Sequence, residues 1–296
     1  MKILLFGANG QVGWELQRSL APLGELIALD RRSTGFCGDI GDLSGISDTV
    51  RRVQPTVIVN AAAHTAVDKA ENEPELARLL NTLAPGVLAE EASKSGALLV
   101  HYSTDYVFDG SGTNAWTETD QTAPLSVYGH SKLEGERLIQ AVCPKSLIFR
   151  TSWVYAARGG NFAKTMLRLA QERDRLTVID DQFGAPTGAD LLADVTSHVI
   201  RQVVQHPLDA GLYHLVAGGE TSWHEYAEYV LAQAKLVRPD IQITAMELAA
   251  VPSSAFITAA VRPHNSRLDT RKIQTVFNLS LPSWKRGVAR MLAEIL

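Results

Sequence analysis

The sequence predicts an α/β protein, in which a doubly wound parallel sheet is accompanied by a smaller C-terminal α+β domain. In the first half of the chain, short apolar runs alternate with amphipathic helical stretches, which is the pattern of β-α-β units. The apolar runs are continuous, as in parallel strands that are covered on both faces. A glycine-rich turn at residues 7–13 directly follows the first run, and such a turn is typical of the first β-α connection in this architecture.

The first domain is predicted to span residues 1–154. Its strands and helices are expected to alternate, because each apolar run is followed by a stretch with helical spacing of apolar residues. The expected strands are residues 2–6, 26–29, 57–60, 97–103 and 147–151. The expected helices are residues 11–20, 43–53, 75–95 with a break near Pro85, and 127–141.

The second domain is predicted to span residues 155–296 and to lie over the carboxyl ends of the strands. The β-α alternation is looser here, and Pro252, Pro263 and Pro282 interrupt the chain. The segment from about 176 to 205 is expected to return to the first domain. The expected elements are helices at 161–171, 188–205, 223–234 and 283–296, and strands at 176–179 and 212–216.

Composition excludes several classes of function. The 296 residues include 28 Lys and Arg against 32 Asp and Glu, a net charge of −4, so no basic excess is present to hold a nucleic-acid backbone. Cys37 and Cys143 are far apart and outside any CxxC pattern, which argues against a metal or redox motif. No apolar run approaches the roughly 18 residues of a membrane span. We therefore expect a soluble, cytoplasmic protein without a nucleic-acid or membrane partner.

The glycine turn reads Gly7-Ala8-Asn9-Gly10-Gln11-Val12-Gly13, with GxxGxxG spacing. Glycines in such a turn allow close backbone approach, and the following helix N-terminus faces a pyrophosphate. The predicted sheet is therefore of the Rossmann, dinucleotide-binding type. Asp30 ends the second strand and favours the ribose hydroxyls of NADH. Arg31 and Arg32 follow at once, and guanidinium groups favour the 2′-phosphate of NADPH. We expect both coenzymes to be used.

The third strand ends in Asn60-Ala61-Ala62-Ala63-His64-Thr65. Small residues at the carboxyl end of a strand leave room for a ligand beside the backbone, although they also occur where a helix packs tightly. His64 has no evident acid or base partner in the sequence. It is therefore expected to support the loop rather than to take part in catalysis.

The most informative constellation is Tyr128-Gly129-His130-Ser131-Lys132, preceded by Ser103-Thr104-Asp105. Tyr128 and Lys132 share one helix face at i and i+4 spacing. A nearby ammonium lowers the pKa of a phenol, which suits a general acid that protonates an alkoxide. Thr104 ends the fourth strand, where its hydroxyl can polarise a substrate carbonyl.

Taken together, these motifs resemble those of the extended short-chain dehydrogenase/reductase superfamily, and the finer matches resemble its dTDP-4-dehydrorhamnose reductase family. The matches extend over nearly the whole chain. They are Asn60–Thr65 with Val67-Asp68-Lys69-Ala70-Glu71, Ser103-Thr104-Asp105-Tyr106-Val107-Phe108, Arg150-Thr151-Ser152-Trp153-Val154-Tyr155, Asn161-Phe162, Gly184-Ala185-Pro186-Thr187, and Arg262-Pro263 with Asn265-Ser266-Arg267-Leu268.

The resemblance implies NAD(P)H-dependent reduction of dTDP-4-dehydro-6-deoxy-L-mannose to dTDP-L-rhamnose, for bacterial surface polysaccharide such as the O-antigen of lipopolysaccharide. It implies that Tyr128 is the proton donor, Lys132 its partner and Thr104 the tuning hydroxyl. It places the sugar nucleotide at Thr104, Asp105 and Trp153. It also implies a homodimer, with Mg²⁺ possible between subunits near Asp190 and Glu294. The implied cofactor residues are Gly7, Gly10, Gln11, Val12, Asp30, Asp39, Ile40, Ala63, His64, Thr65, Tyr102, Tyr128 and Lys132.

Two other classes of function remain open at this stage. A non-catalytic regulator, like the regulatory subunit of methionine adenosyltransferase, keeps the same nucleotide motifs. A sister sugar-nucleotide epimerase or dehydratase keeps the Tyr and Lys. A dehydratase needs an acid-base pair beside the upstream Thr, and here Thr104 is followed by Asp105 and then Tyr106, so the second acid is missing.

Overall fold

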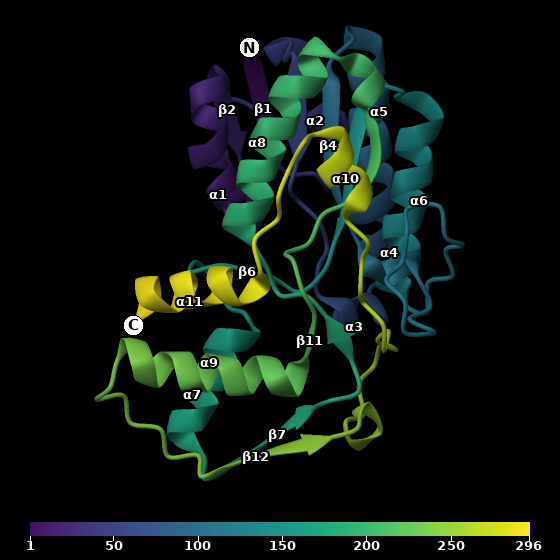
Figure 1. The fold of residues 1–296 in the computed structure, drawn as a ribbon. Coiled ribbons are helices and arrows are strands. Elements are labelled where there is room, and N and C mark those ends of the chain that lie inside the picture. The colour runs from purple at the N-terminus through teal and green to yellow at the C-terminus, as the bar shows by residue number, and fades with distance from the viewer.

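The computed structural model describes residues 1–296 and has a six-stranded parallel sheet at its centre, with strand order β10-β5-β4-β3-β1-β2. β2 lies on one side of β1, whereas β3, β4 and β5 follow in order on its other side, so the sheet is doubly wound as predicted (Figure 1). Five of its strands come from the first half of the chain. The strands are β1 (Lys2–Phe6), β2 (Glu25–Leu29), β3 (Val57–Asn60), β4 (Leu98–Thr104), β5 (Ser146–Thr151) and β10 (Gly211–His214).

Helices cover both faces of this sheet, which explains why its strands are almost continuously apolar. On one face, apolar residues of α1 and α8 pack with β1, β3, β4 and β5. On the other face, α2, α5 and α6 do so. The covering helices are α1 (Gln11–Leu20), α2 (Leu43–Val53), α5 (Ala84–Ser95), α6 (Val127–Val142) and α8 (Ala189–Gln205).

The stretch predicted as one helix with a break near Pro85 consists of α4 (Pro74–Arg78), a π-helical turn (Leu79–Leu83) and α5. Pro85 has no N–H to donate to the carbonyl of Asn81, four residues earlier, so the helix widens there instead of ending. Gly135 of α6 uses the opening, because a Cβ at this position would lie 2.2 Å from that Asn81 carbonyl oxygen. The turn therefore lets α6 approach closely.

The second half forms a separate layer below the carboxyl ends of the strands (Figure 1). Its core is formed by α7 (Phe162–Glu172), α9 (Trp223–Val237) and α11 (Trp284–Ile295). Three two-stranded sheets complete it, in which β12 pairs with β7, β11 with β8 and β6 with β9. Their bounds are β6 (Val154–Tyr155), β7 (Arg175–Ile179), β8 (Phe183–Gly184), β9 (Thr187–Gly188), β11 (Thr221–Ser222) and β12 (Glu247–Val251).

The chain crosses between the two parts several times after residue 154. Within the segment 176–205, β7 pairs with β12 in the lower layer, whereas α8 packs on the main sheet. β10 then forms the edge of that sheet beside β5, and α10 (Arg271–Val276) packs against it through Ile273. The chain thus returns to the main sheet both within the segment 176–205 and after it. No helix is sufficiently long and apolar to cross a bilayer.

Candidate active site

The glycine turn after β1 has a geometry that only glycine permits. Gly7 has φ +86°, and a Cβ on it would lie 2.7 Å from the backbone nitrogen of Ala62, which follows β3. A Cβ on Gly13 would lie 2.0 Å from the Gly7 carbonyl oxygen. The first turn of α1 is therefore drawn against the carboxyl edge of the sheet, where its N-terminus has no side-chain cap at Gly10. Its free N–H groups suit a phosphate.

Gln11 adds an independent observation at the same place. Its Nε2 donates to the carbonyl of Gly160 at 3.0 Å, while its Oε1 is buried without a hydrogen-bond partner. A buried acceptor without a donor is costly. The turn, the uncapped helix and this acceptor together form a cradle that fits the pyrophosphate and ribose of a dinucleotide. Val12 contributes differently, because it packs against the apolar core.

Asp30 lies where the ribose edge of such a site is expected. Its carboxylate accepts from the side chain of Asn9 and from the backbone N–H of Arg32 at 2.8 Å. The side chains of Arg31 and Arg32 are exposed. The acid and the two guanidinium groups thus occupy the same turn, and neither is buried away from a ligand.

The other residues expected around the cofactor differ in burial and in the contacts they make. Asp39 caps its own turn through the Gly41 N–H at 2.9 Å, and Ile40 is buried in the core. Asn81 binds the backbone N–H and carbonyl of His64, at 2.8 and 3.0 Å. The His64 imidazole lies 3.0 Å from Glu73 and thus supports its loop. In the same loop, Ala63 is half-buried and Thr65 exposed.

Thr104, Asp105 and Tyr128 are brought together at the carboxyl end of β4. The Thr104 hydroxyl donates to Asp105 at 3.1 Å. Burial raises the pKa of Tyr128 to about 12, and hydrogen bonding to Thr104 offsets part of this. Burial also raises the pKa of Asp105 to about 6, and one of its carboxylate oxygens has no partner. The site therefore holds a phenol that keeps its proton and a carboxyl group poised near neutral pH.

Lys132 lies on the same helix as Tyr128, one turn later. The sequence predicts that its ammonium lowers the pKa of Tyr128, but the pKa is raised, because burial of the phenol dominates. The Lys132 amine binds the backbone carbonyl of Tyr102 at 2.6 Å and faces His101 of β4. The Tyr102 side chain points to the other face of the sheet, where its hydroxyl lies 2.6 Å from Thr196 of α8.

A buried ion pair fixes the helix that carries Tyr128 and Lys132. Glu136, one turn beyond Lys132, accepts three hydrogen bonds from Arg150 of β5, at 2.9, 3.2 and 2.6 Å. Ser103 of β4 donates to the same carboxylate. All three side chains are at least 95% buried, and breaking such a pair typically costs about 3–5 kcal/mol. Helix α6 is thus locked to β4 and β5 directly beneath the site.

Trp153 follows β5 in a left-handed backbone conformation, with φ +49°, which is rare for a bulky residue. Its indole stacks on Trp223 of α9, with ring centroids 3.6 Å apart. A Cβ on Gly184 would lie 2.8 Å from the same indole. The lower layer therefore holds Trp153 in place, while part of its surface stays accessible.

The chain matches the family model described as RmlD substrate binding domain over residues 1–296. It is 61% identical to the dTDP-4-dehydrorhamnose reductase of Salmonella typhimurium, covering 100% of this chain and 98% of the relative. A crystal structure of a dTDP-4-dehydrorhamnose reductase from Clostridium acetobutylicum is 34% identical, with a TM-score of 0.90 and coverage of 100% and 99%. The chain belongs to the dTDP-4-dehydrorhamnose reductase family.

A second family member of known structure, from Bacillus anthracis, was solved in complex with NADP. It is 33% identical to this chain with a TM-score of 0.87, and the match covers 99% of both chains. The doubly wound fold that the sequence predicts is thus the fold of the dTDP-4-dehydrorhamnose reductase family.

In the present protein, two arginines of the C-terminal loop form ion pairs with acidic side chains. Arg262 pairs with Asp68 of α3 (Val67–Ala70), at 2.5 Å. Arg267 pairs with Glu220 and lies over the ring of Phe183, with its guanidinium carbon 4.5 Å from the centroid. The loop thereby joins the lower layer to the edge of the candidate site.

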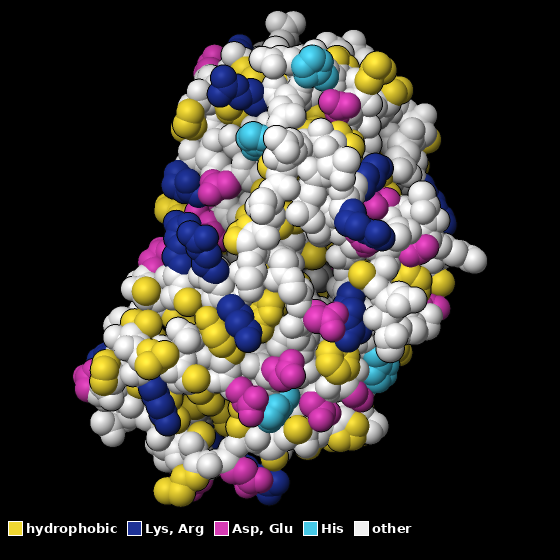
Figure 2. All heavy atoms as spheres, in the orientation of Figure 1, with side chains coloured by type: hydrophobic (Ala, Val, Ile, Leu, Met, Phe, Trp, Pro, Cys, Tyr) yellow, Lys and Arg dark blue, Asp and Glu magenta, His cyan; other side chains and the backbone are white.

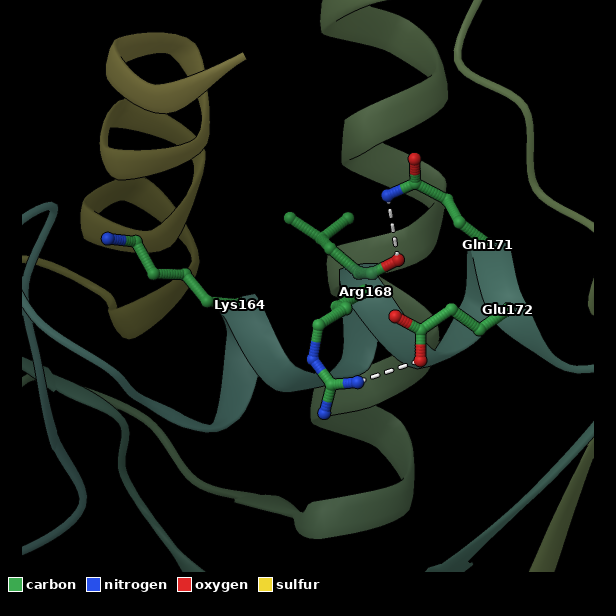
Figure 3. A pocket seen from close by; sticks show the side chains of 5 residues that line it. Lys164, Arg168, Gln171 and Glu172 are labelled. Carbon is green, nitrogen blue, oxygen red and sulfur yellow. Dashed lines mark hydrogen bonds and ion pairs between the residues drawn. The ribbon is translucent and has the colours of Figure 1, made fainter.

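The hollow in Figure 3, of about 370 Å³, does not belong to this reductase site. It lies along one face of α7 and is lined by residues of that helix alone. Its polar contacts are an exposed ion pair between Arg168 and Glu172 at 2.7 Å and hydrogen bonds from Gln171 and Lys164 to backbone carbonyls. Because no buried polar group faces it, we assign it no ligand. Figure 2 shows acidic and basic side chains interspersed over one face, without a continuous basic stripe.

Residues outside the sequence-based predictions complete the site. They are His101 beneath Lys132, Asn81 behind His64, Glu136, and Trp223 against Trp153; Asn60 and Arg150 lie in the matched motifs, but the sequence assigned them no role. One signal was available in the sequence. His101 and Ser103 lie two residues apart on a strand, whereas Lys132 and Glu136 lie four apart on a helix. Both spacings are about 6–7 Å. His101 can therefore face Lys132 while Ser103 faces Glu136.

Proposed function

We propose that this protein reduces the C4 keto group of dTDP-4-dehydro-6-deoxy-L-mannose to give dTDP-L-rhamnose, with NADPH or NADH as hydride donor. The observation that carries the proposal is the cluster of Thr104, Asp105 and Tyr128 at the carboxyl end of β4, beside the glycine cradle of α1. Family membership over the full chain supports the substrate. The product is a precursor of bacterial surface polysaccharide.

In this proposal the bound dinucleotide supplies a hydride to C4 of the sugar. Tyr128 donates its phenolic proton to the oxygen, so that the keto group becomes a hydroxyl. The raised pKa of Tyr128 keeps that proton in place until an alkoxide develops. Thr104 turns its one hydroxyl hydrogen from Asp105 to the same oxygen, and Lys132 holds the ribose beside Tyr128. Gly7, Gly10, Gln11 and their neighbours hold the pyrophosphate.

The reaction requires net consumption of coenzyme, which separates it from the alternatives. An epimerase or dehydratase recycles its nicotinamide, and a regulatory subunit turns over no sugar. We expect one NADPH to be oxidised for each dTDP-L-rhamnose formed, measured by absorbance and by product chromatography. Conversion of the sugar without loss of NADPH would favour a recycling enzyme, and absence of conversion would favour the regulator.

Both coenzymes are expected to support turnover, with kcat/KM values within about tenfold of each other, or about 1.4 kcal/mol. Asp30 favours the free ribose hydroxyls of NADH, whereas Arg31 and Arg32 favour a 2′-phosphate. Steady-state kinetics with each coenzyme measure the ratio. A preference beyond about a hundredfold in either direction would contradict the dual arrangement, and Asp30→Ala would then show whether the acid takes part.

Trp153→Ala is expected to raise KM for the sugar nucleotide by about tenfold or more, because the stacked indole can cover an apolar sugar face. NADPH affinity should stay within about twofold of the wild-type value, since Trp153 adjoins the lower layer rather than the glycine cradle. Kinetics for the sugar nucleotide and a fluorescence titration with NADPH test both parts. An equal loss of affinity for both ligands would indicate a general loss of structure.

A homodimer and a bridging Mg²⁺ ion are further proposals that derive from the family. Within one chain, Glu15, Asp190 and Glu294 line a common pocket. However, Asp190 pairs with Arg290 at 3.3 Å, and no three His, Cys, Asp or Glu side chains are grouped to bind a metal. One chain thus lacks a complete ligand set for the ion. Light scattering with and without EDTA tests both proposals.

A further inference from the structure

A chain of three buried polar side chains lies beneath the site, and its histidine has no part in the proposed reaction. It runs from Asn60 at the end of β3 through His101 of β4 to Lys132 of α6, and each side chain is 99% buried. The Asn60 amide nitrogen lies 3.2 Å from His101 Nδ1. His101 Nε2 lies 2.9 Å from Lys132 Nζ.

The backbone fixes the direction of these hydrogen bonds. Asn60 Oδ1 accepts from the Ala62 N–H at 3.1 Å, and because a backbone N–H can only donate, the amide cannot be reversed without loss of this bond. Asn60 Nδ2 therefore donates to His101 Nδ1. A neutral imidazole that accepts at Nδ1 has its hydrogen at Nε2. His101 thus donates to Lys132 Nζ, and only a neutral amine has a lone pair to accept.

Burial shifts the pKa values of both Lys132 and His101 toward the neutral forms that this direction requires. Burial lowers the pKa of Lys132 to about 8 and lowers that of His101 well below its ordinary value, with Lys132 adding to the shift. The charge of Glu136 raises the pKa of Lys132, but the Glu136 carboxylate is paired with Arg150. Tyr102 presents only its backbone carbonyl on this side, and Tyr128 lies one helical turn earlier.

We propose that His101, oriented by Asn60, is a positioning residue for Lys132. It occupies the lysine lone pair, while the Tyr102 carbonyl takes one N–H. The second N–H of the amine is left free for the ribose and Tyr128. Uptake of a proton by Lys132 breaks its hydrogen bond with His101, so the ammonium releases that proton readily. A group that returns a proton to Tyr128 after each turnover must do so. This role rests on the proposed reductase function.

The first test is the tautomer of His101, measured by long-range ¹H–¹⁵N correlation on protein with ¹⁵N-labelled histidine. The His101 signals are assigned by their loss in His101→Gln. We expect a neutral imidazole with its hydrogen at Nε2 at about pH 9, where the Lys132 amine has released its proton. A hydrogen at Nδ1, or a protonated ring, would overturn the proposal. Because this measurement needs no substrate, its failure is distinct from failure of the proposed activity.

The second test is Asn60→Asp. The new carboxylate has almost the same shape as the amide, but it can only accept a hydrogen bond, so His101 must carry its hydrogen at Nδ1. The imidazole then accepts at Nε2 from a lysine ammonium. The high-pH limb of the kcat/KM profile should shift to higher pH by about one unit, because the added negative charge favours the protonated form of Lys132. His214→Gln is the matched control, since His214 is also fully buried on this sheet and should leave the limb unchanged. A uniform loss of rate in Asn60→Asp with an unmoved limb would overturn the proposal.

Discussion

Tyr128→Phe is expected to lower kcat by about 10²–10⁴-fold, the usual contribution of general acid catalysis. The phenol is the acid that the structure places beside Thr104, and phenylalanine keeps the ring against Tyr106, where the two centroids are 5.6 Å apart. The fold and the coenzyme site should therefore be preserved. Turnover measured with saturating NADPH isolates the loss of the proton donor.

Two comparisons make this result specific. Tyr229→Phe also removes one hydroxyl, but on α9, away from the site. That hydroxyl donates to the Lys285 carbonyl at 2.9 Å, and the variant should keep wild-type kcat. Lys132→Met should impair both turnover and NADPH binding, because one amine serves both. If Tyr128→Phe retains more than about half of the wild-type activity, Tyr128 is not the proton donor.

The sequence predicted the main sheet well, because buried parallel strands leave an unambiguous pattern. The predicted strand at 57–60 and the helices at 11–20 and 43–53 coincide with β3, α1 and α2. The π-helical turn at Leu79–Leu83 was not predicted. Its cause is local, the proline at 85, but its form depends on Gly135 of another helix. Tertiary packing of this kind cannot be read from one segment.

Much of the candidate site could be predicted for the same reason. The carboxyl ends of parallel strands meet at one edge, so residues that follow β1, β3, β4 and β5 were expected to converge there. Residues beneath this edge were missed. His101 interrupts an apolar strand, and only the register between β4 and α6 shows that it faces Lys132.

The arginines of the C-terminal loop show a second limit of sequence reasoning. From residue type alone, Arg262 and Arg267 are candidates to bind a diphosphate, since guanidinium matches phosphate geometry. In the structure, Asp68 and Glu220 hold these guanidinium groups. Asp68 lies 194 positions from Arg262 along the chain, and no local pattern predicts such a pair. Binding of a diphosphate by either arginine would require exchange of its acid partner.

Removal of the nucleotide from the substrate is expected to have the largest effect of all. A free 4-keto sugar offers few groups to bind, and enzymes gain transition-state binding from remote parts of a substrate. In the proposed arrangement the keto sugar lies at Thr104, Tyr128 and Trp153, and the nucleotide is held by the lower layer. We expect kcat/KM to fall by at least about a thousandfold, or roughly 4 kcal/mol.

The most direct test of the proposed function is therefore NADPH oxidation by the purified protein with dTDP-4-dehydro-6-deoxy-L-mannose and with the corresponding free keto sugar, at equal concentrations. The proposal predicts rapid oxidation with the first substrate, formation of dTDP-L-rhamnose in equal amount, and a rate near background with the second. Comparable turnover of the two would contradict a sugar-nucleotide reductase and would leave a general carbonyl reductase.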